Sequence, residues 1–339
     1  MSNSLISCRG VWKVFGPDPT AALAANPSGD DLLSTGHVPA VRDVSFDIPP
    51  GEMLVVMGLS GSGKSTLIRC LCRLLEITEG TVEVEGQDIG SLSERALIEL
   101  RRAKMGMVFQ NFGLLPNRSV LENVAFPLEM RGQSASSRRA RALEMVELVG
   151  LKGREDYFPR ELSGGQQQRV GIARSLAIEP DIWFLDEPFS ALDPLIRRDM
   201  QDEFLRLQGM LGKTIVFITH DFDEALKLAD RIAIMKDGRV EQIDTPDQIV
   251  MAPATPYIAR FTEDIDKAKV VHAGSLAGPV NGALPEGAPV DGHATIRDLA
   301  RQLAEDSRDA LPVADANGQI TGILNRRQAL DLLFGDAAQ

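Results

Sequence analysis

The stretch GLSGSGKST, residues 58–66, is the feature that most limits how this chain can fold. It fits the pattern G-x-x-x-x-G-K-[ST], whose glycines let backbone N–H groups face a phosphate while the next helix points its positive end at it. That geometry needs a buried strand before the loop and a helix after it. MLVVM (53–57) is continuously apolar, as a buried parallel strand is, and leucines recur at helical spacing over 64–75. A Gly/Ser-rich turn that fits the pattern by chance is the alternative.

We therefore predict that this loop holds a nucleotide. The loop lysine, Lys64, should reach the β- and γ-phosphates of ATP, and Ser65 should be a ligand of Mg²⁺. The residues predicted to bind ATP here are Gly58, Ser60, Gly61, Ser62, Gly63, Lys64, Ser65 and Thr66.

Apolar or alternating segments separated by helical patterns predict an α/β fold with a largely parallel core sheet. The segments expected to form strands are 11–16, 41–48, 53–57, 81–89, 105–110, 182–188 and 214–220. Four of them lead to polar, potentially reactive positions: Gly58, Gln110, Asp186 with Glu187, and His220. Ligands of open α/β sheets bind beyond the carboxyl ends of the strands, so we expect these four positions to share one site.

The strand IWFLDEP places two acids at its end. Asp186 is the natural outer partner of Mg²⁺, and Glu187 could accept a proton from an attacking water, a role typically worth about 10²–10⁴ in rate. An acid pair that caps a helix before Pro188 is the alternative. The following helix should begin with Asp193 and Pro194, and we expect Ile196, Met200, Phe204 and Leu207 on its buried face.

A second glycine motif, LSGGQQQRVGIARSLA, covers residues 162–177. Ser163 suits a helix N-cap, while Gly164 and Gly165 expose backbone, so this helix start predicts a second anion site. One phosphate loop needs no second cradle unless the two motifs meet across an interface.

Taken in order, GLSGSGKST, VFQ, LSGGQ, FLDEP, SALD and ITH resemble the nucleotide-binding subunit of an ABC transporter over about residues 5–260. The resemblance implies a P-loop NTPase of the ABC type in residues 1–265. Its core sheet would be mixed, with an antiparallel β subdomain beside it and a helical subdomain at about 111–180.

The resemblance also implies how the motifs cooperate. Two copies would enclose two ATP molecules, and Ser163, Gly164, Gly165 and Gln166 of one copy would close the site of the other. Asp193 would lie at the dimer seam. The catalytic residues would be Glu187, His220, Gln110 and Lys64, and Mg²⁺ would be held by Ser65, Gln110 and Asp186.

Two further positions depend on the resemblance. Phe15, in KVFG, matches the aromatic residue on which the family stacks adenine, although a core aromatic is the alternative. The loop after Gln110 carries Phe112, Leu114 and Leu115, which we expect to form a docking surface for a membrane partner; packing beneath the helical subdomain is the alternative.

Longer stretches, such as LCRLLEITEG and FGLLPNRSVLENVAFPLEM, resemble the ATPase of glycine betaine/proline betaine importers more closely. ATPases that serve choline or histidine uptake are similar. By this resemblance the chain would drive uptake through a separate permease, with a substrate-binding protein as an indirect partner. Residues 17–39, rich in Pro, Gly, Ala and Asp, are expected to be a surface-loop insert.

The C-terminal part is expected to contain a linker, 266–291, and a helix–strand–turn–strand–helix unit, 292–336. This small α+β unit resembles one cystathionine-β-synthase (CBS) repeat, where the family usually carries two. Adenosine-binding repeats often place Ser or Thr, then Asp, after the glycine of the second strand. Here Gly322 is followed by Asn325 and Gln328, and a structural and a regulatory role both remain open.

Charge and hydropathy exclude other classes. The formal net charge of −12 argues against a nucleic-acid partner. No apolar run approaches the roughly 20 residues that cross a bilayer, and the N-terminus lacks a signal-peptide layout, so we expect a cytosolic protein. The resemblance implies that it lies peripherally, through the permease, on the cytoplasmic face of the inner membrane. A soluble ABC ATPase of DNA repair or translation is the competing function, and a small-molecule kinase would leave LSGGQ unexplained.

Overall fold

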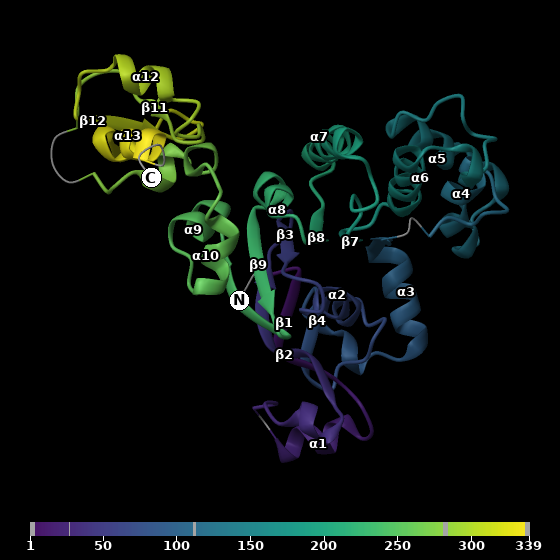
Figure 1. The fold of residues 1–339 in the computed structure, drawn as a ribbon. Helices are drawn as coiled ribbons and strands as arrows, with labels where there is room; N and C mark the ends of the chain where they lie inside the picture. Colours follow the sequence, from purple (N-terminus) through teal and green to yellow (C-terminus); the bar gives the residue numbers. More distant parts are fainter. Residues whose placement is uncertain (1–3, 27, 111–112, 281–283, 336–339) are drawn as a thin grey trace. The chain divides into compact units, whose positions relative to one another are not determined.

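The structure is a computed structural model that describes residues 4–335 except 27, 111–112 and 281–283. The chain forms two compact units, Met1–Glu241 and Gln242–Gln339 (Figure 1). Within the described residues, no helix combines the length and the apolar character that crossing a bilayer requires.

The core sheet of the N-terminal unit has six strands in the order β10-β9-β3-β8-β7-β6. Its parallel strands are β3 (Met53–Met57), β6 (Met105–Val108), β7 (Ile182–Asp186), β8 (Thr214–Thr219) and β9 (Arg231–Lys236). Only two residues separate β9 from β10 (Arg239–Asp244), so these neighbours are antiparallel. The core sheet is therefore mixed. Strands β3, β7 and β8 are buried throughout, as their continuous apolar sequences predicted.

A second, antiparallel sheet has the order β2-β1-β4-β5. Its strands are β1 (Ile6–Phe15), β2 (Val38–Ile48), β4 (Glu79–Val84) and β5 (Gln87–Asp88). The helix after the glycine loop, α2 (Lys64–Leu71), contacts both β1 and β2 of this sheet and β7 and β8 of the core sheet. The glycine loop therefore lies where the two sheets meet.

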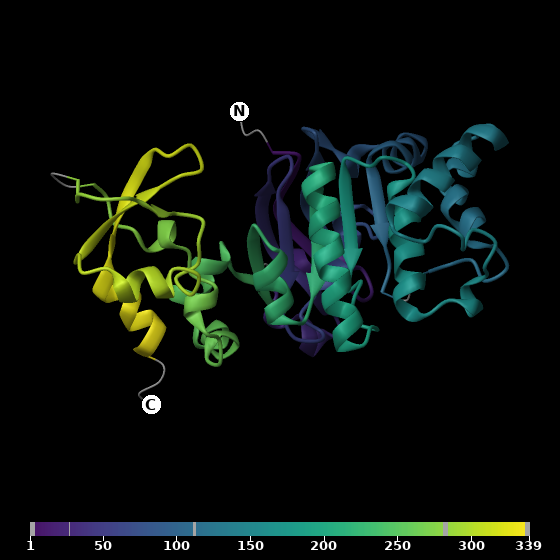
Figure 2. The ribbon, with the colours of Figure 1, turned by 90° about the horizontal axis from the view of Figure 1, so that it is seen from above.

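The helical subdomain lies at one end of this unit, beyond β6, in both views (Figures 1 and 2). Its helices are α4 (Val120–Met130), α5 (Ala135–Leu148) and α6 (Gly164–Leu176), which pack on one another. Helix α3 (Glu94–Lys104) leads into β6. Helices therefore occupy much of the region that the sequence predicted to be helical.

Helix α7 (Pro194–Leu211) packs through Phe204 into an aromatic cluster formed with Trp183, Phe189 and Phe217, at ring-centroid distances of 5.3–5.9 Å. The expected buried face is confirmed for Met200, Phe204 and Leu207 but is wrong for Ile196, which is 39% exposed. Ile196 lies on the first turn of α7, where its Cγ2 would be only 2.8 Å from a Cβ at Gly165. It contacts the start of α6 rather than the core.

Truncating this cluster should destabilise the N-terminal unit strongly. Phe204→Ala removes a fully buried ring, and we expect the free energy of unfolding to fall by about 3–5 kcal/mol because the cavity cannot refill. Denaturant unfolding, followed through tryptophan fluorescence, measures the change. Phe334→Ala, at a side chain 62% exposed, is the control and should stay within about 0.5 kcal/mol. Equal losses for both variants would contradict the packing described.

The expectation that residues 17–39 form only a surface loop is wrong. The segment contains α1 (Pro19–Ala25) and a 3₁₀ turn at Leu32–Thr35. Asp18 caps α1, and Leu23 and Leu32 are buried against Trp12 and Val14 of β1. Two leucines spaced far apart among Pro, Gly and Ala give no periodic signal, so the composition concealed this small core.

The C-terminal unit contains α9 (Pro246–Met251), α10 (Pro256–Thr262), α11 (Ala273–Leu276), α12 (Ala300–Glu305) and α13 (Arg326–Phe334). Its sheet has the order β11-β12-β13, with β11 (Val290–Asp291), β12 (Ala310–Ala314) and β13 (Ile320–Asn325). The expected helix–strand–turn–strand–helix order is present, although α12 is shorter than the helix expected from HATIRDLARQLAEDS, residues 293–307.

The domain limits differ from those expected. The compact units divide between residues 241 and 242 rather than at 265. Residues 266–291 were expected to be a linker, yet Ala268, Val271, Ala273 and Val290 belong to the core of the C-terminal unit. Their small side chains made the segment look like a linker, whereas they allow close packing against β12 and β13.

Candidate functional site

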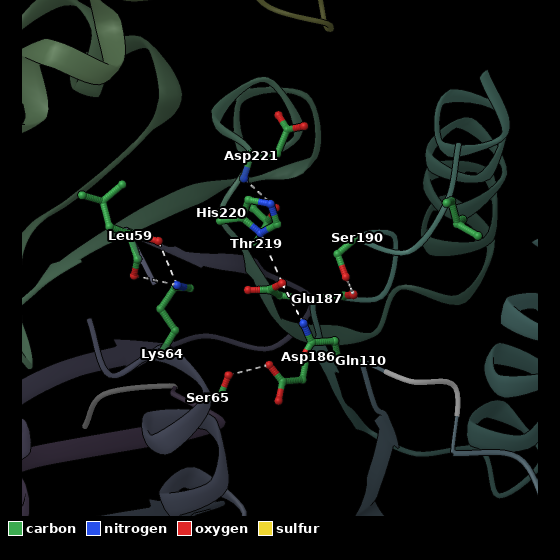
Figure 3. A network of polar contacts seen from close by, with 12 residues as sticks. Leu59, Lys64, Ser65, Gln110, Asp186, Glu187, Ser190, Thr219, His220 and Asp221 are labelled. Atoms are coloured by element: carbon green, nitrogen blue, oxygen red, sulfur yellow. Dashed lines mark hydrogen bonds and ion pairs between the residues drawn. The ribbon is translucent and has the colours of Figure 1, made fainter. Parts of the chain in front are cut away.

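The glycine loop holds Lys64 at its mouth (Figure 3). Lys64 Nζ donates hydrogen bonds to the carbonyl oxygens of Gly58 (2.8 Å) and Leu59 (3.1 Å). Burial lowers the pKa of Lys64, while the carboxylates of Glu187 and Asp186 raise it. The loop therefore positions a mostly buried ammonium group that a phosphate oxygen can bind in place of the two carbonyls.

One glycine of the loop is required by close packing. Gly63 has a φ of +102°, and a Cβ there would lie 2.1 Å from the carbonyl oxygen of Ala40. Ala40 belongs to β2, so this strand packs directly against the glycine loop. Only glycine at position 63 leaves room for the contact.

Ser65 and Asp186 are adjacent, as the sequence predicted for a magnesium site. Ser65 Oγ donates to Asp186 Oδ1 at 2.9 Å, and the Asp186 side chain is almost fully buried. Burial raises the pKa of Asp186, against the hydrogen bond from Ser65 and the charge of Arg69. A divalent cation would offset the unfavourable burial of this carboxylate, and hydroxyl and carboxylate oxygens are ligands that Mg²⁺ prefers. The residues present therefore fit Mg²⁺.

Two predicted catalytic side chains converge on the carboxylate of a third, Glu187. Glu187 Oε2 accepts a hydrogen bond from Gln110 Nε2 at 3.2 Å and lies 3.2 Å from His220 Nδ1 (Figure 3). These residues follow β6, β7 and β8, which are neighbours in the sheet. The expectation that strand ends bring them to one place is therefore confirmed.

The backbone holds Glu187 in an uncommon conformation, with a φ of +46°. Its N–H donates to the carbonyl of Ile218 (3.1 Å), and its own carbonyl accepts from Ser190 Oγ (3.0 Å). A left-handed conformation of a residue other than glycine is unfavourable and persists only where the surroundings impose it. Here it directs the carboxylate away from the strand and toward Gln110 and His220.

Helix α6 begins as predicted. Ser163 is the N-cap, with a capping box in which Ser163 Oγ accepts from the Gln166 N–H and Gln166 Oε1 accepts from the Ser163 N–H. Figure 1 shows α6 among the helices at one end of the unit and α2 near the sheets. Within a single chain, the start of α6, which was predicted to be a second anion site, is thus separate from the lysine loop.

Phe15 ends β1 opposite Val38 and is 40% exposed, so it is not a core aromatic residue. Lys13 Nζ lies 5.1 Å from the centroid of its ring. The neighbouring aromatic residue, Trp12, is the buried one, at 7% exposure. An exposed ring at this strand end is available to stack on a nucleotide base.

Sequence reasoning missed the side chains that join the loops after β7 and β8. Asp193 lies at the N-cap position of α7 without a side-chain capping bond. Arg197 instead donates to the carbonyl of Leu192 (3.3 Å) and pairs with Asp221 Oδ2 (3.2 Å). Asp221 directly follows His220 and caps α8 (Phe222–Leu228). The Asp after the strand, followed by a helical pattern, was the available signal for that cap.

An apolar hollow of about 400 Å³ lies beside Gln110. Its lining includes Phe109, Leu115, Phe126, Met130 and Arg131. Leu114 and Leu115 are half-buried rather than exposed. Phe112 lies outside the described residues.

Comparison with known proteins relates this site to one family. Residues 41–190 match the ABC transporter family. The chain is 71% identical over 337 residues to the trimethylamine N-oxide transport system ATP-binding protein TmoW of Ruegeria pomeroyi, covering 98% of each chain. It is 52% identical to the protein of the same name from Pelagibacter ubique, again with 98% of each chain covered. It is 42% identical to the glycine betaine/proline betaine transport system ATP-binding protein ProV of Escherichia coli, over 98% of this chain and 86% of that protein.

A solved structure of an ATP-binding cassette also matches this chain. A dimeric structure of the ATP-binding cassette MJ0796, in a post-hydrolysis state and bound to ADP and Pi, is 35% identical with a TM-score of 0.61. The match covers 71% of this chain and 98% of that one.

Proposed function

The chain belongs to the ABC transporter family of ATP-binding proteins, which hydrolyse ATP in step with transport, and on that premise we propose how its residues do so. The observation that carries the proposal is the convergence of Gln110 and His220 on the Glu187 carboxylate. Glu187 is the general base: it accepts a proton from water as the oxygen attacks the γ-phosphorus and the bond to ADP breaks.

The other residues bind and orient ATP. Lys64 and the loop N–H groups hold the β- and γ-phosphates, and His220 holds the γ-phosphate from the opposite side. Ser65, Asp186 and Gln110 would hold Mg²⁺, which would supply positive charge to offset the charge that develops on the phosphates. Gln110 donates to Glu187 and so orients the carboxylate toward the water.

We propose that two copies of the chain close each site, with residues 163–166 of one copy facing the loop at Lys64 of the other. Three features support this. The start of α6 is suited to bind an anion, yet it lies apart from the loop in its own chain. Leu195, two residues after Asp193, is 70% exposed, and a dimer interface at this position would bury its apolar side chain. The solved relative is dimeric.

The hollow beside Gln110 is proposed as the docking site of an integral membrane permease. Phe109 and Met130 line it and are 42% and 48% exposed, so an apolar segment of the permease would bury them. Gln110 directly follows Phe109, and movement at this position would pass from the γ-phosphate to the permease. The chain would then lie peripherally on the cytoplasmic face of the membrane.

We propose trimethylamine N-oxide as the transported solute, taken up through the permease with a separate substrate-binding protein. The support is the name of the relatives that are 71% and 52% identical over nearly the whole chain. Glycine betaine, which shares the methylated nitrogen, is the second candidate because relatives named for it are 42–49% identical. Choline, histidine and the soluble DNA-repair or translation functions have no comparable support.

For the C-terminal unit we propose a single CBS-like repeat with a structural role. Asn325, which follows Gly322 where adenosine-binding repeats often place Ser or Thr and then Asp, caps α13 by accepting from the Gln328 N–H at 3.2 Å. Its side-chain oxygen therefore stabilises the start of α13, which is a structural role.

Purification from native membranes tests the proposal. The tagged chain should retain an integral membrane subunit in detergent, and in proteoliposomes with the binding protein, trimethylamine N-oxide should stimulate ATP hydrolysis more than glycine betaine does. Met130→Glu, in the hollow, should lose the membrane subunit, because docking would have to remove water from a carboxylate that replaces an apolar contact. Met210→Glu, at an exposed methionine of α7, is the matched control and should keep it. A chain that stays soluble without any membrane subunit would contradict the proposal.

A further inference from the structure

The connection between β1 and β2 is long, and Phe15, the proposed base-stacking residue, lies directly before it. Phe15 and Val38 are the last paired residues of the two strands, and residues 16–37 separate them. Most hairpins close through a loop of about two to five residues, which fixes the strand ends tightly. A longer connection costs more entropy to close and by itself leaves the strand end less restrained. Contacts other than a short loop must therefore fix the position of Phe15.

His37 closes the base of this connection. The residue is only 9% exposed. Nε2 lies 2.7 Å from the carbonyl oxygen of Pro17, and because a carbonyl only accepts, Nε2 is the donor. Nδ1 lies 2.9 Å from Thr35 Oγ1. The His37 side chain thus links Pro17, which lies just after Phe15, to Thr35, which lies just before β2.

The ring also packs against the backbone next to Phe15. Gly16 has a φ of +140°, and a Cβ at this position would lie 2.5 Å from His37 Cδ2. Only glycine allows the imidazole to approach so closely. The position of the Gly16 backbone, and with it the direction of Phe15, therefore depends on the histidine ring.

The rest of the insert is anchored independently. Leu23 and Leu32 pack on Trp12 and Val14. Arg42 of β2 donates to the carbonyl of Ser28 at 2.9 Å and also pairs with Asp30. These contacts fix the outer part of the insert on the sheet, so removing the His37 bonds should loosen the strand end without releasing the insert.

We infer that His37 is a positioning residue for nucleotide binding, which holds Phe15 ready to stack on the base. The inference rests on the proposed role of Phe15. Lys13 contacts the ring of Phe15, which keeps a large exposed area for the base. Ordering this ring before the ligand arrives lowers the entropy lost on binding.

His37→Ala should weaken ATP binding about fivefold, the effect of roughly 1 kcal/mol for one lost buried hydrogen bond. The affinity for inorganic tripolyphosphate should not change, because that ligand carries no base to stack on Phe15. Turnover at saturating ATP should also remain normal. His37→Gln should recover most of the ATP affinity, since its side-chain N–H can reach the Pro17 carbonyl.

Equilibrium titration of the full chain with ATP and with tripolyphosphate provides the measurement. His293→Ala, at an exposed histidine of the other unit, is the control and should match the wild type. In a Phe15→Ala background, His37→Ala should have no further effect. Thr35→Val, which removes only the hydroxyl partner, should weaken ATP binding less, and serves if His37→Ala fails to fold.

The outcomes separate the two claims. Unchanged ATP affinity in His37→Ala, or an equal loss for ATP and tripolyphosphate, would overturn the positioning role. Failure of the wild-type chain to bind ATP in a Lys64-dependent way would instead remove the proposed function.

Discussion

Glu187→Gln should bind ATP normally yet hydrolyse it about 10²–10⁴-fold more slowly. Gln has the shape of Glu, so the turn fixed by the Ile218 and Ser190 contacts should be preserved. The neutral amide, however, is no base for the proton of the attacking water. Phosphate release in the assembled transporter measures the rate, and equilibrium binding to the isolated chain measures the affinity.

Glu203→Gln provides the matched control. Glu203 is a partly buried carboxylate on α7 that pairs with Arg206, far along the helix from the site. Its replacement should leave both turnover and ATP affinity at the wild-type level. Wild-type turnover in Glu187→Gln would show that another group accepts the proton.

Ser163→Arg should abolish hydrolysis in the assembled complex while a single chain still binds ATP. The substitution removes the N-cap of α6, worth about 1 kcal/mol, and places a long side chain where the partner's γ-phosphate is proposed to lie. The loop at Lys64 is untouched in the same chain, so its own contacts to the nucleotide persist. Steady-state hydrolysis and equilibrium ATP binding measure the two effects.

The control for the cap itself is Ser134→Arg. Ser134 is the N-cap of α5 in the same helical subdomain, where its Oγ accepts from the Ser137 N–H. This variant should lose a similar amount of helix stability and keep its turnover. If both arginine variants hydrolyse ATP equally well, α6 has no role in the site.

The sequence predicted the core sheet well because burial on both faces leaves a direct signal. Strands β3, β7 and β8 are continuous apolar runs, and polar residues directly after them had to share one edge of a parallel sheet. The insert was misjudged for the opposite reason. Its small core depends on Leu23 and Leu32, which pack on another element and show no period of their own.

The site was predictable in its residue types but only partly in its contacts. The resemblance assigned Gln110, Glu187 and His220, whereas the hydrogen bond from Gln110 to Glu187 required the geometry. Arg197, which joins the loops after β7 and β8, gave no signal because an arginine on an exposed helix turn looks like a solvated charge. Contacts between residues distant in sequence can be identified only once the three-dimensional structure is known.

The central claim is that each ATP is enclosed between the lysine loop of one copy and the start of α6 of another. The most direct test is the mass of the purified chain in Glu187→Gln form, measured by light scattering with and without MgATP. We predict a dimer only with MgATP, and a monomer that still binds ATP when Ser163→Arg is added. Dimers that form equally with both substitutions, or a Glu187→Gln chain that stays monomeric with ATP bound, would contradict the account.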